Sequence, residues 1–166
     1  ISIAGSGFGA GIGPFACRIG RTDIVPATVE LRSRVVRCVT PARAEGAALV
    51  EVTLNGQQYH GEIGAPSALH FGFYSPPHVL SMSPSSGSVL GRTAVTIAGT
   101  GFRDAYNHLC RWGNLTTNIT ELGATQLVCA TPQTPTGSSA VEITLNGQQY
   151  TSDGLRFSHY LHPRVR

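Results

Sequence analysis

The sequence predicts an all-β protein made of two tandem β-sandwich units. A ten-residue run, Val50–Tyr59, returns as Val141–Tyr150 with a single Val-to-Ile change. Apolar and polar residues alternate in each copy, which is the period of a strand with one buried face. Twenty glycines, ten prolines and almost no apolar residues at helical spacing indicate short strands joined by turns. The copies lie about ninety residues apart, so the 166-residue chain has room for two compact units.

The repeat also sets the expected boundaries of the two units. Ile1–Gly5 aligns with Val95–Gly99, a strand inside the second copy. We therefore expect residues 1–77 to form a unit that lacks its first strand, residues 78–166 to form a complete unit, and the whole to be a piece of a longer protein. The joint at Pro76-Pro77 should be stiff, because proline fixes its own φ and restricts the residue before it.

A glycine-rich turn follows the first strand of each copy, as Gly5–Phe8 and Gly99–Phe102. A dinucleotide-binding loop would need a third glycine, but Ala10 and Asp104 stand at that position and no helical pattern follows. The spacing therefore predicts a turn between sandwich strands.

Each unit has two cysteines at corresponding places, Cys17 and Cys38 in the first, Cys110 and Cys129 in the second. None has a second cysteine or a histidine at zinc-ligand spacing. The pattern favours one disulfide per unit, Cys17 with Cys38 and Cys110 with Cys129, and hence an oxidising compartment. Two buried free thiols per unit in a cytosolic protein remain the alternative.

Two glycosylation sequons, at Asn114 and Asn118, lie between the cysteines of the second unit. The corresponding segment of the first unit, residues 21–26, has none and differs in length. Glycans on these asparagines would agree with a secreted protein.

After each repeated strand comes an Asn-Gly pair, Asn55-Gly56 and Asn146-Gly147. Such a pair suits a type I′ turn, whose two central residues both need positive φ. We expect a hairpin there, with a returning strand through Gln-Gln-Tyr.

No metal, cofactor or catalytic site is expected. His159 and His162 are three residues apart, but on a strand such residues point to opposite faces. His60, His70, His78 and His108 accompany no carboxylate cluster. Glu51 and Glu142 fall on the polar face of the repeated strand and are expected to be solvated. No nucleophile elbow, metalloprotease motif or phosphate loop occurs, so we expect a protein that is not an enzyme.

Composition also limits the partners. The net charge is only +3, and every basic residue is a scattered arginine. Such sparse positive charge does not suit a groove that binds the phosphates of a nucleic acid, so no nucleic-acid partner is expected. The sequence has no run of eighteen apolar residues, so we expect no direct membrane insertion of this segment.

A series of short motifs runs in order along the second unit: Pro84-x-x-Gly87, Gly91-x-Thr93, the strand Val95–Gly99, Gly101-Phe102, Cys110-x-Trp112-Gly113, Cys129-x-Thr131-Pro132, Asn146-Gly147 and Phe157-x-x-Tyr160. In this order the motifs resemble the IPT/TIG family of immunoglobulin-like domains. The resemblance covers the chain as one truncated and one complete copy. It implies early-set immunoglobulin-like sandwiches. It also implies hosts such as plexin-like and Met-like receptors, fibrocystin-like ciliary proteins, microbial and algal surface proteins, and Rel-type transcription factors.

We therefore expect a non-catalytic structural or adhesive module of a large extracellular or cell-surface glycoprotein, on a ciliary or flagellar surface or in a filament among other places. Expected partners are other domains of the same chain, other surface proteins, further copies of itself and N-linked glycans. One alternative is a carbohydrate-binding module of a secreted enzyme, with Trp112 or Tyr106 stacking on sugars, although Trp112 fits a core position better. The other is an intracellular Rel-type dimerisation domain.

Overall fold

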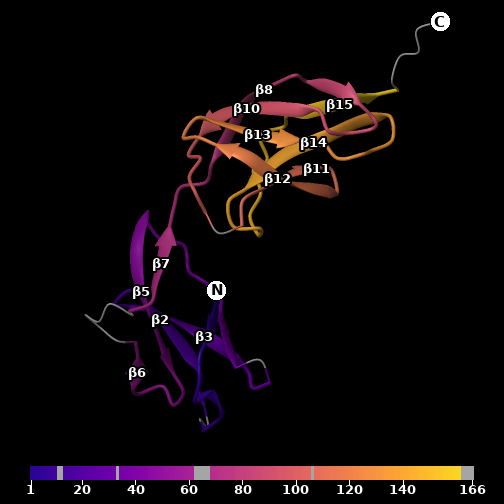
Figure 1. Ribbon diagram of the computed structural model, residues 1–166. Helices are drawn as coiled ribbons and strands as arrows, with labels where there is room; N and C mark the ends of the chain where they lie inside the picture. The colour runs from indigo at the N-terminus through magenta and orange to yellow at the C-terminus, as the bar shows by residue number, and fades with distance from the viewer. Residues whose placement is uncertain (11–12, 33, 62–67, 106, 162–166) are drawn as a thin grey trace, which may run out of the picture. The chain divides into compact units, whose positions relative to one another are not determined.

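The computed structural model describes residues 1–10, 13–32, 34–61, 68–105 and 107–161 (Figure 1). Contacts divide the chain into Ile1–Tyr74, here unit 1, and Ser75–Arg166, here unit 2. Each unit is described by itself. Apart from a 3-10 turn at Phe8–Ala10, the elements are strands. In the described part of the chain, no helix has the length and apolar character needed to cross a membrane.

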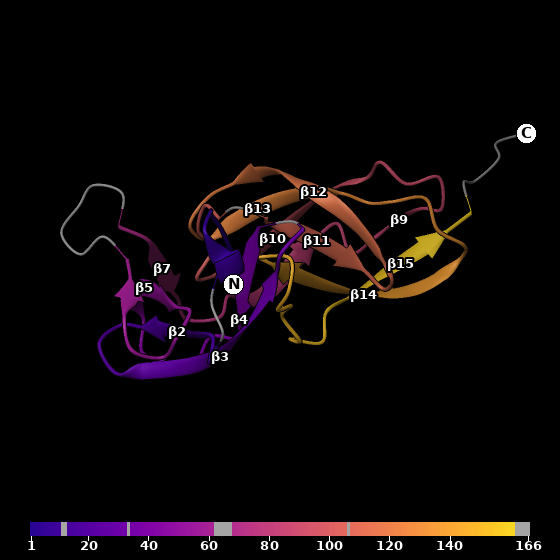
Figure 2. The same ribbon diagram turned by 90° about the horizontal axis from the view of Figure 1, so that it is seen from below.

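Unit 2 is an eight-stranded sheet with the order β8-β10-β13-β12-β11-β14-β15-β9. Its strands are β8 (His78–Ser83), β9 (Ser86–Ser88), β10 (Ala94–Thr100), β11 (Leu109–Trp112), β12 (Leu115–Leu122), β13 (Gln126–Ala130), β14 (Gly137–Thr144) and β15 (Arg156–Tyr160). All neighbours are antiparallel except β15 and β9, which pair in parallel. Figure 2 shows β10, β12 and β13 of this sheet from below.

Two long strands curl this sheet into a sandwich by changing partners along their length. Residues 115–118 of β12 pair with β11, and from Ile119 onward the strand pairs with β13, with a register shift between Ile119 and Glu121. In the same way, residues 141–144 of β14 pair with β11 and residues 137–140 pair with β15. Strands that switch between layers make the corners of a sandwich. The two inner faces therefore enclose one core.

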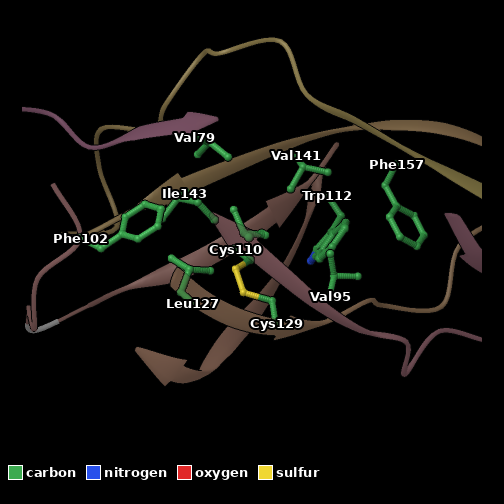
Figure 3. Packing of buried hydrophobic residues seen from close by; sticks show 11 residues of the cluster. Val79, Val95, Phe102, Cys110, Trp112, Leu127, Cys129, Val141, Ile143 and Phe157 are labelled. Carbon is green, nitrogen blue, oxygen red and sulfur yellow. A yellow bond between two sulfur atoms is a disulfide. The ribbon is translucent and has the colours of Figure 1, made fainter. Parts of the chain in front are cut away.

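The core of unit 2 is built from alternate residues of its strands (Figure 3). Trp112 is 1% exposed, and its ring meets that of Phe157 edge-on at a centroid distance of 5.3 Å. The indole Nε1 donates to Thr117 Oγ1 at 2.9 Å, so the one polar atom of the ring is satisfied inside the core. The other buried members are Val79, Val95, Ile97, Phe102, Cys110, Leu127, Cys129, Val141 and Ile143.

Unit 1 has the same plan with fewer strands. They are β1 (Ser2–Ala4), β2 (Ala16–Ile19), β3 (Asp23–Glu30), β4 (Val35–Cys38), β5 (Gly46–Thr53), β6 (Tyr59–His60) and β7 (His70–Phe73). The order is β1-β4-β3-β2-β5-β6, with β7 also pairing with β5. Strand β3 pairs first with β2 and then with β4, as β12 does in unit 2.

Equivalent strands of the two units pair in corresponding registers, except that β12 has a register shift against β13 where β3 has none against β4. Ile3 lies opposite Val36 in unit 1, as its equivalent Ile97 lies opposite Leu127 in unit 2. Strand β1 thus corresponds to β10, and β2, β3, β4, β5 and β7 correspond to β11, β12, β13, β14 and β15. Among the described residues of unit 1, no strand stands in the place of β8 or β9.

Candidate functional site

The four cysteines form one disulfide inside each unit. Cys17 bonds to Cys38 with the Cα atoms 6.3 Å apart, and Cys110 bonds to Cys129 at 6.5 Å. All four lie in the buried cores. Figure 3 shows the sulfur–sulfur bond of unit 2 in the middle of the core, between β11 and β13. Since β12 separates these strands in the sheet, the bond ties the two layers of the sandwich together.

A side-chain cluster on the outer face of each unit has the same composition and geometry. In unit 1, Arg18 of β2 donates to Glu51 of β5 through Nε at 2.6 Å and through Nη2 at 2.8 Å. The guanidinium lies 4.2 Å from the ring centroid of Tyr59. The hydrogen bond to Glu51 raises the pKa of Arg18 above its ordinary value. Arg18 therefore keeps its charge between a carboxylate and an aromatic face.

In unit 2 the cluster consists of Arg111, Glu142 and Tyr150. Arg111 Nε donates to Glu142 Oε2 at 2.7 Å, and its guanidinium lies 3.8 Å from the Tyr150 centroid. Arg111 and Glu142 are direct cross-strand partners, as are Arg18 and Glu51. We call each set an Arg–Glu–Tyr cluster. The cluster joins β2, β5 and β6 in unit 1, and β11, β14 and the loop after β14 in unit 2.

The expectation of a solvated Glu51 is wrong. The side chain of Glu51 is 3% exposed, and that of Glu142 is 20% exposed and ion-paired. Both residues do lie on the outer face, but the long arginine side chain from the neighbouring strand covers them. The sequence did contain a sign of the Arg–Glu–Tyr cluster, because Cys-Arg, Val-Glu and Gln-Gln-Tyr occur at matching places in both units. Each carboxylate is occupied by its arginine, so neither is positioned as a free general base.

The predicted type I′ turns are also wrong. Strand β5 meets β6 at Thr53 and Tyr59, which leaves residues 54–58 in the connection, and Gly56 has positive φ whereas Asn55 does not. Thr53 Oγ1 accepts from Gly56 N at 2.9 Å, and Asn55 Oδ1 accepts from Gln57 N at 2.9 Å. These side chains replace the backbone bond of a tight turn.

Unit 2 repeats this capped loop. Thr144 Oγ1 accepts from Gly147 N at 2.9 Å, and Asn146 Oδ1 accepts from Gln148 N at 3.0 Å. No strand returns through residues 148–150, where one was expected. The chain instead rejoins the sheet where Thr151 N donates to Ile143 O.

Both sequon asparagines are exposed. Asn114 lies in the turn between β11 and β12, and Asn118 lies on β12 with its side chain on the outer face. Register places Asn118 opposite Leu109. The equivalent strand of unit 1, β3, carries Pro26 opposite Ala16 at that position.

The histidines in the described part of the chain do not form a cluster of metal ligands. His159 is 5% exposed, packs against Phe157, and lies with Nε2 3.2 Å from Ser139 Oγ; burial lowers its pKa. His78 has one carboxylate partner, Asp153, at 3.2 Å. His162 lies outside the described residues. No three metal-ligating side chains come together anywhere in the described ranges.

Of the two residues expected to stack on sugars, the structure describes only Trp112. Trp112 is buried, so its ring cannot stack on a sugar in the folded unit. Tyr106 lies outside the described residues. A hollow of about 680 Å³ on unit 1 is lined by Arg18, Arg21 and Arg43 among others. Two of these arginines are already paired, Arg18 with Glu51 and Arg43 with Asp23.

Comparisons with known proteins agree with this geometry. The IPT/TIG domain family matches residues 77–159. Fibrocystin-L of Homo sapiens is 27% identical over 158 residues, which cover 92% of this chain and 3% of that protein. Plexin-B2 of Mus musculus is 28% identical over 144 residues, covering 85% of this chain and 8% of that protein. The chain thus spans a small part of the relatives that it matches.

A solved structure of the Plexin A4 extracellular region has the same fold. It aligns with a TM-score of 0.59 and 16% identity over 91% of this chain and 13% of that one. The disulfide-linked sandwich, its motifs in order and the match over 77–159 lead to one conclusion. The chain belongs to the IPT/TIG domain family.

Proposed function

We propose that the chain is a non-catalytic interaction module of a larger extracellular or cell-surface glycoprotein. The observation that carries the proposal is the pair of disulfides, one in the core of each sandwich. Disulfides persist in oxidising compartments. The likeness to Fibrocystin-L and to the Plexin A4 extracellular region supports the same location.

The module works by presenting surfaces. The carboxylates of the two Arg–Glu–Tyr clusters are already occupied, and the described residues bring no three metal ligands together. Adhesive or spacing contacts with other domains of the parent protein, with other surface proteins or with further copies would use exposed loops and strand edges. A ciliary or flagellar surface is one setting for such a parent.

Glycans on Asn114 and Asn118 belong to this proposal. Both side chains are exposed near one another along β12 and the turn before it, so two glycans would shield the outer face of these strands. We expect protein partners to avoid this face. A partner packed over both asparagines would contradict the expectation.

The test is expression of the chain as a secreted protein in cells that perform N-glycosylation. Mass spectrometry after N-glycosidase treatment should show two occupied asparagines, and Asn114→Gln and Asn118→Gln should each remove one glycan. Asn55→Gln, at an asparagine outside any sequon, is the matched control and should leave the number of glycans unchanged. Bare asparagines in correctly folded, secreted protein would refute the glycoprotein assignment.

Non-reducing peptide mapping of native material tests the location separately. Cys17–Cys38 and Cys110–Cys129 peptides are expected. Four free thiols would instead favour the intracellular Rel-type alternative. The carbohydrate-binding alternative loses its main support, since Trp112 is buried; glycan-array binding by the folded chain would restore it.

A further inference from the structure

The hollow on the outer face of unit 1 gathers three arginines from different parts of the chain. Its volume is about 680 Å³. Arg18 comes from β2, Arg21 from the turn between β2 and β3, and Arg43 from the loop before β5. Ala47 and Leu49 of β5 also line it. The hollow thus combines cationic side chains with small and apolar ones.

Neighbouring groups hold two of these arginines in place. Arg43 Nη1 donates to Asp23 Oδ2 and to Ile19 O, both at 2.6 Å. Arg18 is fixed by the carboxylate and the ring of its Arg–Glu–Tyr cluster. A guanidinium carries five N–H donors in a rigid plane. Within the described residues, Nε and Nη2 of Arg43 and Nη1 of Arg18 are therefore left to bind another acceptor.

Arg21 adds a positive charge that no described carboxylate offsets. Its side chain is exposed, and the ion pairs of this region join Arg18 with Glu51 and Arg43 with Asp23. The three arginines thus exceed their two carboxylate partners by one charge. An anion that enters the hollow meets donors already fixed in position and an excess of positive charge.

Unit 2 shows that the fold does not require this set of arginines. Both units have the arginine of the Arg–Glu–Tyr cluster. Counted from the Thr-Pro pair of each unit, however, Thr134 stands at the position of Arg43. The turn that carries Arg21 in unit 1 carries Asn114 in unit 2. Two arginines of the hollow are therefore particular to unit 1.

The corresponding part of the surface is covered in unit 2. Arg156 of β15 donates through Nε to Ser138 Oγ and through Nη2 to Ser138 O, both at 3.0 Å. Register places Ala47 at the position of Ser138, and His70 at that of Arg156. His70 Nδ1 instead lies 2.9 Å from Ala68 O. The small Ala47 therefore stays exposed beside the arginines.

We propose that this hollow binds an anionic group, a sulfate or a carboxylate, carried on a saccharide. Free N–H groups of Arg18, Arg21 and Arg43 donate to the anion, and the apolar lining from β5 contacts the sugar ring. The donors surround one hollow, which suits a compact sugar better than an extended acidic peptide. Charge holds this ligand, so the site differs from stacking on Trp112. The choice of a saccharide rests on the proposed extracellular location, which the disulfide mapping tests separately.

The test titrates the folded chain, freed of its own N-linked glycans, with three oligosaccharides. Heparin tetrasaccharide carries sulfates and carboxylates, hyaluronan tetrasaccharide carries carboxylates only, and cellotetraose is neutral. NMR should show shifts of the Gly20, Thr22 and Leu49 amides with an anionic saccharide and none with cellotetraose. Tighter binding of heparin would assign the site to sulfate, and equal binding of the two anionic saccharides would assign it to carboxylate.

Variants locate the binding in the hollow. Arg21→Gln removes an exposed donor and should weaken binding about tenfold, the worth of one charge-assisted hydrogen bond. Arg43→Gln should weaken it similarly, but this variant also loses the pair with Asp23 that helps to hold the turn. Arg32→Gln is the matched control, because it removes one exposed charge of unit 1 outside the hollow and should leave the affinity unchanged.

Equal losses of affinity in Arg21→Gln and Arg32→Gln would overturn the proposal, because binding would then follow net charge alone. Titrations that move none of the three amides would also overturn it. Binding of cellotetraose at these amides would favour the carbohydrate-binding alternative instead. A glutamate-rich peptide that binds there as tightly as either anionic saccharide would show that the ligand is an acidic peptide.

Discussion

Replacing Thr144 by valine should remove the acceptor that organises the capped loop of unit 2. Thr144 is 0% exposed, and its Oγ1 accepts from Gly147 N at 2.9 Å and from Asn146 N at 3.3 Å. Valine keeps the shape of the side chain, so the change leaves two N–H groups without this partner and creates no cavity. Losing a buried acceptor costs about 1–3 kcal/mol. Asn146 and Gly147 are only half-buried, so water can hydrogen-bond to part of their freed N–H groups. We therefore expect the free energy of unfolding of unit 2 to fall by about 1–2 kcal/mol.

The single tryptophan of the chain makes the measurement specific to unit 2. Trp112 is buried in the unit 2 core, so its fluorescence on urea unfolding reports that unit. With a slope of about 1 kcal/mol per molar urea for a unit of this size, the midpoint should fall by about 1–2 M.

Thr53→Val makes the same change in unit 1, where Thr53 Oγ1 accepts from Gly56 N at 2.9 Å, and should leave the Trp112 transition in place. Thr144→Ser keeps the hydroxyl and should cost less than Thr144→Val. A free energy of unfolding for Thr144→Val within about 0.5 kcal/mol of that of the parent chain, the range of ordinary surface changes, would refute the reasoning.

Three other changes can be followed with the same fluorescence signal. Cys110→Ala with Cys129→Ala should lower the stability of unit 2 by about 3 kcal/mol on the loop-entropy account, and an unchanged midpoint would count against a stabilising disulfide. Burial lowers the pKa of His159 below 6.5, so unfolding takes up a proton: stability should be complete above pH 6.5 and decline as the pH falls below it. His159→Phe, which has Phe73 as its unit 1 equivalent, should flatten this part of the pH profile. Gly99→Ala should destabilise by about 1–3 kcal/mol or more, since the new Cβ meets the His78 carbonyl, and a stability equal to that of the parent would show that β8 can move aside.

The fold could be predicted from the sequence because the alternation of apolar and polar residues indicates strands and the internal repeat indicates two similar units. Val50 and Val52 alternate with polar residues and are buried, as the period required. The loop after that strand was predicted less well. Asn55-Gly56 has the composition of a type I′ turn, but Thr53 lies where its hydroxyl can cap a wider loop, and the dipeptide rule takes no account of that residue.

The Arg–Glu–Tyr clusters were missed for a different reason. Alternation assigns Glu51 to the outer face, which is where it lies, but says nothing about the neighbouring strand. Arg18 reaches Glu51 because β2 pairs with β5 in one register, and register is a property of the sheet. Predicting the cluster required knowing which strands pair and in which register. The sequence hinted at this only by repeating the motif at Arg111 and Glu142.

Each disulfide also sets how far its unit can lengthen when its ends are pulled. The pulling force passes through the disulfide, so the residues between the two cysteines are not stretched. Cys17 and Cys38 are separated by 21 positions, and Cys110 and Cys129 by 19. At about 3.5 Å per extended residue, each bond withholds about 60–70 Å of contour length until it is reduced. Stretching one molecule should thus give short extension steps in oxidising buffer and longer ones after reduction. A tether built from such units, with its disulfides intact outside the cell, would extend less under a given force than its number of residues implies.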